Sequence, residues 1–188
     1  MTIDISKRSG GAVGISVAEC IDKRFNTWRV RTDFQPDMDE DGEAQKGVTF
    51  IETEYPYKPS MDEVKDFVYA VINAKTDEKI LCGYEWTVLH GADAGKTVKV
   101  WLSDENKENY KAKYDTAKND PELITWPCKF KVAENADRTP VYEYFDNLAE
   151  LKAFYYGGLN YIEQTVNAGW AEKDGFDFTP YEKALNGY

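Results

Sequence analysis

Apolar and polar residues follow a strand-like pattern in the first third of the chain. From residue 26 onward the pattern sharpens, because Trp28, Val30, Thr32 and Phe34 alternate with charged residues, which predicts a half-buried strand. A polar loop over residues 35–47 leads to a second predicted strand over residues 48–55, which is followed by two prolines. Residues 1–24 are interrupted by glycines, a pattern that fits either a flexible lead-in or an irregular strand.

Two capping boxes predict where long helices begin. Ser60 and Glu63 have the spacing at which each side chain can bond to the backbone of the other, and the apolar stripe behind them is expected to end near residue 76. Asn147 and Glu150 repeat this spacing before the longest apolar stripe in the chain. We expect that helix to end at Gly169.

A third helix and two hairpins complete the pattern. Ser103 or Asp104 is expected to cap a helix that Asp120 and Pro121 end. The other predicted elements are two pairs of strands and a short helix: 80–89 with 97–102, 126–132 with 141–145, and 179–185.

The order of these elements predicts an α+β fold, with antiparallel strands and hairpins packed against about three helices. Residues 1–78 are expected to form an N-terminal strand–strand–helix subdomain and residues 79–188 a C-terminal α+β domain, with one compact unit as the alternative. A chain of 188 residues suffices for one substantial core or two small ones. Gly157 and Gly158 weaken the last long helix, so we expect another element to pack closely against them.

The composition of the chain limits the kinds of molecule that it is expected to bind. The formal net charge of −11 argues against direct binding of nucleic acid and of anionic membranes, because no basic cluster offsets it. No apolar run is long enough to span a membrane, and the first residues do not resemble a signal peptide, so we expect synthesis and retention in the cytoplasm. Cys20, Cys82 and Cys128 lack the spacing of a metal site and are expected to be reduced and buried.

Two loops imitate ligand-binding motifs. The segment 91–97 resembles a phosphate-binding loop, but only three residues separate Gly91 from Gly95 and a strand follows where a helix is required, so a hairpin turn is the better interpretation. The acidic segment 37–42 matches the first half of a calcium loop, but Val48 stands where a bidentate carboxylate is required. We expect a solvated acidic loop, with calcium binding as the alternative.

The candidates for catalysis are weak. His90 is the one histidine in the chain and lies beside a turn, where it can act as a base, but no serine or cysteine motif accompanies it. Glu52 and Glu54 share a strand face as paired glycosidase carboxylates can, but in a chain with 34 acidic residues an exposed strand face is the better explanation. We therefore expect no enzyme activity, no catalytic residue, no metal ion and no cofactor.

Four segments together resemble an uncharacterised family encoded by phages and prophages of gut bacteria, often near tail genes. They are WRVRTDFQPD (28–37), GVTFIETEYPYKP (47–59), VWLSDENKENYK (100–111) and AGWAEKDGFDF (168–178). Residues 78–185 resemble a domain of unknown function found in phage tail-fibre and tail-assembly proteins. The family has no established catalytic residues, so the resemblance implies a structural or assembly role.

The expectation is therefore a non-catalytic tail-associated protein that acts through protein–protein contacts. Its partners would be other phage tail proteins or a second copy of itself, and it would be made in the bacterial cytoplasm with the virion as a further location. A carbohydrate-binding module, in which aromatic rings stack on sugars, is the alternative. The residues expected at an interface are Trp86, Trp101, Trp126 and Trp170.

Overall fold

The computed structural model describes residues 4–39 and 41–187, and the chain divides into two compact units. One unit combines the residues up to Lys75 with those from Gly169 onward, and the other is the continuous segment Thr76–Ala168. Each unit has its own hydrophobic core. The α+β class with antiparallel strands is confirmed, and residues 169–188 group with the N-terminal strands, which the sequence pattern did not indicate.

The first unit is built on a four-stranded antiparallel sheet of order β1-β4-β3-β2. The strands are β1 (Ser9–Ala12), β2 (Ala18–Asp22), β3 (Thr27–Met38) and β4 (Ala44–Tyr55). The predicted polar loop over residues 35–47 is wrong for most of its length, because β3 and β4 continue to pair through Gln35 with Thr49 and Met38 with Ala44. Polar side chains there belong to exposed strand positions.

Opposite charges face one another across the two central strands. Arg29 lies opposite Glu54, and Arg31 lies opposite Glu52, in the antiparallel register of β3 and β4. β4 is an inner strand of the sheet, but β1 pairs with it only over Gly47–Phe50, so among the described residues Glu52 and Glu54 pair with β3 alone. Both carboxylates bind arginine side chains, which gives them a structural role.

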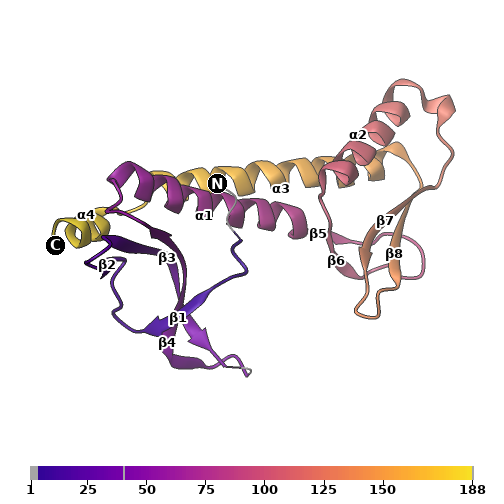
Figure 1. The fold of residues 1–188 in the computed structure, drawn as a ribbon. Helices are drawn as coiled ribbons and strands as arrows, with labels where there is room; N and C mark the ends of the chain where they lie inside the picture. The colour runs from indigo at the N-terminus through magenta and orange to yellow at the C-terminus, as the bar shows by residue number, and fades with distance from the viewer. Residues whose placement is uncertain (1–3, 40, 188) are drawn as a thin grey trace. The chain divides into compact units, whose positions relative to one another are not determined.

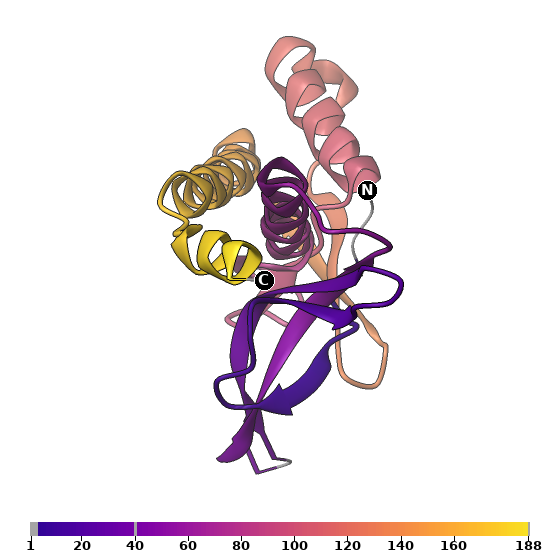
Figure 2. The ribbon, with the colours of Figure 1, turned by 60° about the vertical axis from the view of Figure 1, so that its left-hand side comes forward.

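Two helices cover this sheet. The core of the unit combines residues of β3 and β4 with an apolar face of α1 (Met61–Cys82) and with Tyr181 and Leu185 of α4 (Thr179–Asn186) (Figures 1 and 2). The capping box is confirmed, since Glu63 N–H donates to Ser60 Oγ and Ser60 N–H donates to Glu63 Oε2. The Tyr181 hydroxyl donates to the Arg31 carbonyl and ties α4 to β3.

The second unit contains two hairpins and two helices. The hairpins are β5 (Tyr84–Thr87) with β6 (Thr97–Val100), and β7 (Cys128–Glu134) with β8 (Pro140–Phe145). The helices are α2 (Asp104–Asn119), which a short 3-10 turn η1 (Pro121–Leu123) follows, and α3 (Leu148–Asp174). The two hairpins lie side by side below α3 in Figure 1 and share one core with α2 and α3.

Both long helices extend further than the sequence predicted. α1 continues past residue 76 to Cys82 because no helix-breaking residue occurs before Gly83. At Gly83 a Cβ atom would clash with the Tyr161 hydroxyl, which donates to the Lys79 carbonyl. α3 runs through Gly169 and ends at Asp174, so the predicted end at Gly169 is wrong. A glycine inside a helix only weakens it when packing supports the turns on both sides.

The close approach predicted at the glycine pair in α3 is confirmed. The Tyr84 hydroxyl donates to the Phe154 carbonyl over 3.0 Å. A Cβ at Gly157 would lie only 2.3 Å from that hydroxyl oxygen, whereas a Cβ at Gly158 would lie 3.6 Å from the Tyr84 ring. Burial of this tyrosine raises its pKa to about 12.

Candidate functional site

The four tryptophans expected at an interface differ in exposure. Trp86 and Trp126 are half-buried and pack against the core of the second unit, Trp86 with its ring edge-on to Phe154. Trp101 in the second unit is 56% exposed, and Trp170 in the first unit is 59% exposed. The interface role stays a prediction, and these two exposed rings are the ones that a partner can reach directly.

A groove of about 760 Å³ lies between β6 and β7, beside Trp101. The residues that line it are Cys82, Lys96–Lys99, Trp101, Asn106 and Lys131–Ala136. Each strand contributes consecutive residues, whose side chains point to alternate faces. The backbone edges of the two strands therefore form part of the groove wall, together with the side chains.

The facing edges of β6 and β7 are unpaired in the part of the chain that the structure describes. β6 pairs with β5 alone, and β7 pairs with β8 alone. Next to the turn of the hairpin, Val88 N–H donates to the Lys96 carbonyl. In an antiparallel ladder only every second residue of a strand bonds to its partner strand, so the backbone groups of Thr97 and Lys99 point away from β5 toward the open edge. Such an edge can accept an additional strand.

Lysines surround this groove although the chain as a whole is acidic. Lys96, Lys99 and Lys131 line it, and all three are exposed. Lys96 donates to Asn135 Oδ1, which joins the two walls where β6 begins and β7 ends, and Lys131 pairs with Glu134. Lys99 forms no ion pair with any residue that the structure describes. The groove therefore combines strand edges, an indole ring and positive charge.

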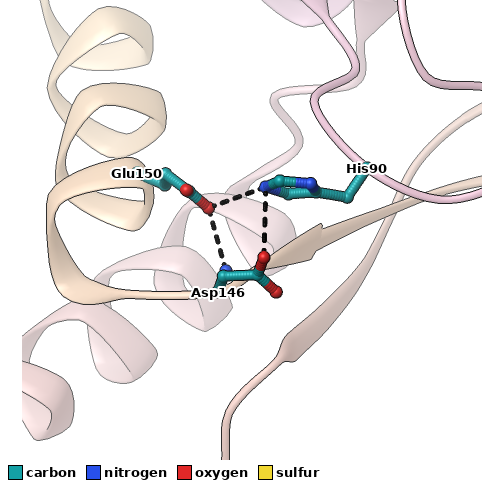
Figure 3. Close-up of side chains that lie close together, drawn as sticks. All are labelled: His90, Asp146 and Glu150. Atoms are coloured by element: carbon teal, nitrogen blue, oxygen red, sulfur yellow. Dashed lines mark hydrogen bonds and ion pairs between the residues drawn. The ribbon is translucent and has the colours of Figure 1, made fainter.

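A second group of polar side chains gathers where β8 leads into α3. The Nε2 atom of His90 lies 3.1 Å from Glu150 Oε2 and 3.6 Å from Asp146 Oδ2 (Figure 3). One ligand atom from each of the three residues lies within 4.8 Å of the other two. Figure 3 shows His90 reaching across from its loop toward the two carboxylates at the start of the helix.

Local structure fixes the positions of these three side chains. Glu150 N–H donates to Asn147 Oδ1 as the second capping box predicted, but the Glu150 carboxylate accepts the side-chain Nδ2 of Asn147 in place of its backbone N–H. The pKa of the Glu150 carboxyl is lowered, chiefly because its Oε2 atom accepts the Asp146 N–H. Hydrogen bonds from the side chains of His90 and Asn147 lower it further. On the other side, His90 N–H donates to the buried Glu143 carboxylate over 3.1 Å.

The arrangement around His90 differs from a catalytic triad. A triad places a nucleophile on one ring nitrogen and a carboxylate on the other. Here both carboxylates, Asp146 and Glu150, approach the same nitrogen of His90. The group is suited to sharing a proton or holding a cation between an imidazole and two carboxylates.

The two loops that imitate ligand-binding motifs have structural explanations. The segment 91–97 turns between β5 and β6, with Gly91 and Gly95 at positive φ, as the hairpin interpretation predicted. In the acidic loop, Asp39 Oδ1 accepts the N–H groups of Asp41 and Glu43, so this carboxylate caps the turn between β3 and β4. Residue 40 of that loop lies outside the described residues.

No protein-family model, no curated protein and no solved structure matches this chain. None of the helices in the described part of the chain is both long enough and apolar enough to cross a membrane. The function must therefore be argued from the groove and from the group around His90.

The sequence contains one signal for this region that hydrophobic periodicity does not reveal. In β8, Val141 and Phe145 occupy buried positions of a period-two pattern, and Glu143 stands between them. A carboxylate at an inward position of a strand marks a site with dedicated donors. The lysines of the groove come from two hairpins and carry no comparable local signal.

Proposed function

We propose that this chain is a non-catalytic protein that acts through protein–protein contacts, and that it holds an extended, acidic segment of its partner in the groove between β6 and β7. The observation that carries the proposal is the pair of unpaired strand edges beside the exposed ring of Trp101. An extended segment can bond to such edges through its backbone, which supplies affinity, while side-chain contacts supply specificity.

Charge selects the kind of segment. Lys99 and Lys131 project from strands whose open edges would otherwise pair with any extended chain. Lysines on an edge discourage pairing with neutral strands, because pairing would remove water from their ammonium groups. They discourage pairing with basic strands because the like charges repel. An acidic strand relieves this repulsion, so we expect a segment that alternates acidic and apolar residues, with an apolar side chain against Trp101.

The resemblance to phage and prophage proteins supports a role in tail assembly as the setting for this contact. Mass spectrometry of particles induced from the host tests that setting directly. Detection of the chain at a fixed ratio to tail proteins supports a virion component, and its restriction to the lysate before particle maturation supports an assembly role. Absence from both fractions contradicts a tail-associated function.

Selection from a display library of ten-residue peptides tests the groove. We expect acidic, alternating peptides to be enriched on the wild-type protein, and enrichment to be lost on Trp101→Ala and on Lys99→Glu. Trp170→Ala is the matched control, because it removes an equally exposed indole from the other unit.

Two outcomes would contradict this proposal. Peptides that bind equally well to Trp101→Ala, Lys99→Glu and the wild type would place the contact elsewhere. Retention on a glycan array that depends on Trp101, without any peptide enrichment, would favour the carbohydrate-binding module instead.

A further inference from the structure

We propose that His90, Asp146 and Glu150 form a binding site for one divalent transition-metal ion, with Zn²⁺ as the ion that fits best. This site is separate from the groove, since none of the three residues lines it. The two proposals therefore rest on different residues and can fail independently.

The distances from the imidazole of His90 to the two carboxylates agree with the spacing of ligands around a tetrahedral ion. Protein nitrogen and oxygen ligands lie about 2.1 Å from Zn²⁺, so two ligands of a tetrahedral site are about 3.4 Å apart. The measured separations of 3.1 Å from His90 Nε2 to Glu150 Oε2 and 3.6 Å from His90 Nε2 to Asp146 Oδ2 lie on either side of this value. The carboxylate oxygens of Asp146 and Glu150 lie within 4.8 Å of each other, and rotation of the Asp146 side chain, which is 58% exposed, can bring them to tetrahedral spacing.

The chemistry of the ligands selects the metal. Imidazole suits zinc, copper and nickel, whereas Mg²⁺ and Ca²⁺ prefer sites made of oxygen atoms alone. Two carboxylates, Asp146 and Glu150, neutralise the charge of a divalent ion. The N-terminus of α3 carries the partial positive charge of the helix dipole, which repels a cation near its first turn. The two carboxylates compensate for this repulsion.

Binding requires one change in protonation. In the metal-free protein the Nε2 atom of His90 shares a hydrogen with Glu150. When an ion binds, Nε2 donates its lone pair to the metal, and the hydrogen moves to Nδ1 of a neutral ring or leaves a charged ring for solvent. Glu150 Oε2 keeps its bond from the Asp146 N–H, because a carboxylate oxygen has a second lone pair for the ion.

The surroundings hold the ligands before any ion arrives. Asn147 orients Glu150 from within the capping box, and the buried carboxylate of Glu143 holds the backbone of His90. Outer contacts of this kind set the direction of metal ligands and raise affinity. His90 is 36% exposed and Asp146 is 58% exposed, so an ion can reach the site and a water molecule can complete its coordination.

Nuclear magnetic resonance of the imidazole provides a direct test, because the chain has one histidine and its ring signals need no assignment. Untagged protein is titrated with ZnCl₂, and calorimetry gives the stoichiometry and affinity in parallel. We expect one ion per chain and a change in the His90 ring signals that saturates at that ratio. Asp146→Asn and Glu150→Gln should each weaken binding at least about tenfold.

Controls separate this site from other ligands on the surface. Asp115→Asn removes a half-buried carboxylate of α2 that pairs with Lys111 and should leave the affinity unchanged. Titration with Co²⁺ reports the donor atoms by absorption, so an intense thiolate band would assign the metal to a cysteine and overturn the proposal.

Three further results would also overturn it. They are the absence of a response of the His90 ring, an unchanged affinity in His90→Ala, and binding of Ca²⁺ in preference to Zn²⁺. Because Glu150 also caps α3, its variant is checked by circular dichroism, and Asp146→Asn gives an independent result if Glu150→Gln is unfolded.

Discussion

The indole of Trp86 donates its Nε1–H to the Glu143 carboxylate over 2.7 Å, in the interior of the second unit. Glu143 is fully buried, and its Oε2 atom also accepts the Leu89 N–H, while Oε1 accepts the N–H groups of His90 and Tyr144. This carboxylate therefore receives four N–H donors from β5, its following loop and β8. It links the two hairpins and places His90.

Replacement of Glu143 by glutamine should destabilise the protein although the shape is conserved. Both carboxylate oxygens accept N–H donors, so the amide group of the glutamine must face two of them. We expect a loss of about 1.5–3 kcal/mol in the free energy of unfolding. Urea denaturation of Glu143→Gln and of the exposed control Glu134→Gln measures the difference, and equal stabilities would show that the buried carboxylate is dispensable.

Arg31 and Arg29 on β3 should differ sharply in their contribution to stability. Arg31 is 2% exposed and binds Glu19 Oε1 at 2.6 Å and Glu52 Oε2 at 3.2 Å, whereas Arg29 is 31% exposed and contacts Glu54. Arg31→Ala removes a buried guanidinium from two half-buried carboxylates, Glu19 and Glu52, which should cost about 2–3 kcal/mol. Arg29→Ala should cost about 0–1 kcal/mol.

The comparison is made by chemical denaturation of both variants under the same conditions. Because the two arginines are two residues apart on one strand, differences in strand propensity cancel. A cost of Arg31→Ala similar to that of Arg29→Ala would mean that water replaces the buried guanidinium without penalty.

Alanine should have opposite effects at the two adjacent glycines of α3. At Gly158 a Cβ meets the Tyr84 ring at an ordinary distance of 3.6 Å, so Gly158→Ala should stabilise the helix by about 0.5–1 kcal/mol. At Gly157 a Cβ would lie 2.3 Å from the Tyr84 hydroxyl oxygen, so Gly157→Ala should destabilise by about 1–3 kcal/mol.

A double-mutant cycle identifies the tyrosine hydroxyl as the cause. Gly157→Ala should cost less in a Tyr84→Phe background, because the clashing oxygen is absent. Thermal unfolding of the four proteins is sufficient. An identical cost of Gly157→Ala in both backgrounds would place the strain elsewhere in the helix.

Acid should weaken the first unit through Asp33. Burial of Asp33 raises its pKa, but the bonds from Lys75 and Arg8 outweigh burial and hold the pKa below its ordinary value. A carboxyl whose pKa is lowered by folding stabilises the protein fully above its unfolded pKa, and that contribution is lost as the pH falls through the folded value. It should therefore be complete above about pH 5 and decline below it.

Asp33→Asn isolates this effect, because asparagine tolerates the positive φ of 54° at this position. The variant should be less stable than the wild type at pH 7, and the difference should shrink as the pH is lowered below about 4. Unfolding by urea at a series of pH values provides the measurement, with the exposed Asp77→Asn as the control. A difference that is constant with pH would contradict the argument.

Local features of this fold were predictable because their causes are local. Ser60 and Glu63 lie three residues apart and form both expected bonds, and Asn147 at the same spacing accepts the expected bond from the Glu150 N–H. The glycine turn between β5 and β6 depends on a positive φ at Gly91 and Gly95, which their identity permits. Such signals depend only on residues close together in the chain, so they can be recognised in the sequence.

The features that were missed depend on residues far apart in the sequence. The approach of His90 to Glu150 joins residues 60 positions apart, and the bond from Tyr181 to Arg31 spans 150 positions. The sequence predicted a half-buried strand in β3 and a short helix over residues 179–185, but it did not show that these two elements meet. The open edges of β6 and β7 are equally invisible, because an edge is defined by which strands do not pair.

The contact between Tyr181 and Arg31 has a consequence for biosynthesis. The core of the first unit needs both its early strands and α4, whereas the second unit is one uninterrupted segment, Thr76–Ala168. The ribosome therefore exposes every residue of the inserted segment before the strands that preceded it can receive their last helix. Part of the apolar surface of the early strands therefore stays uncovered until Tyr181 and Leu185 have been synthesised.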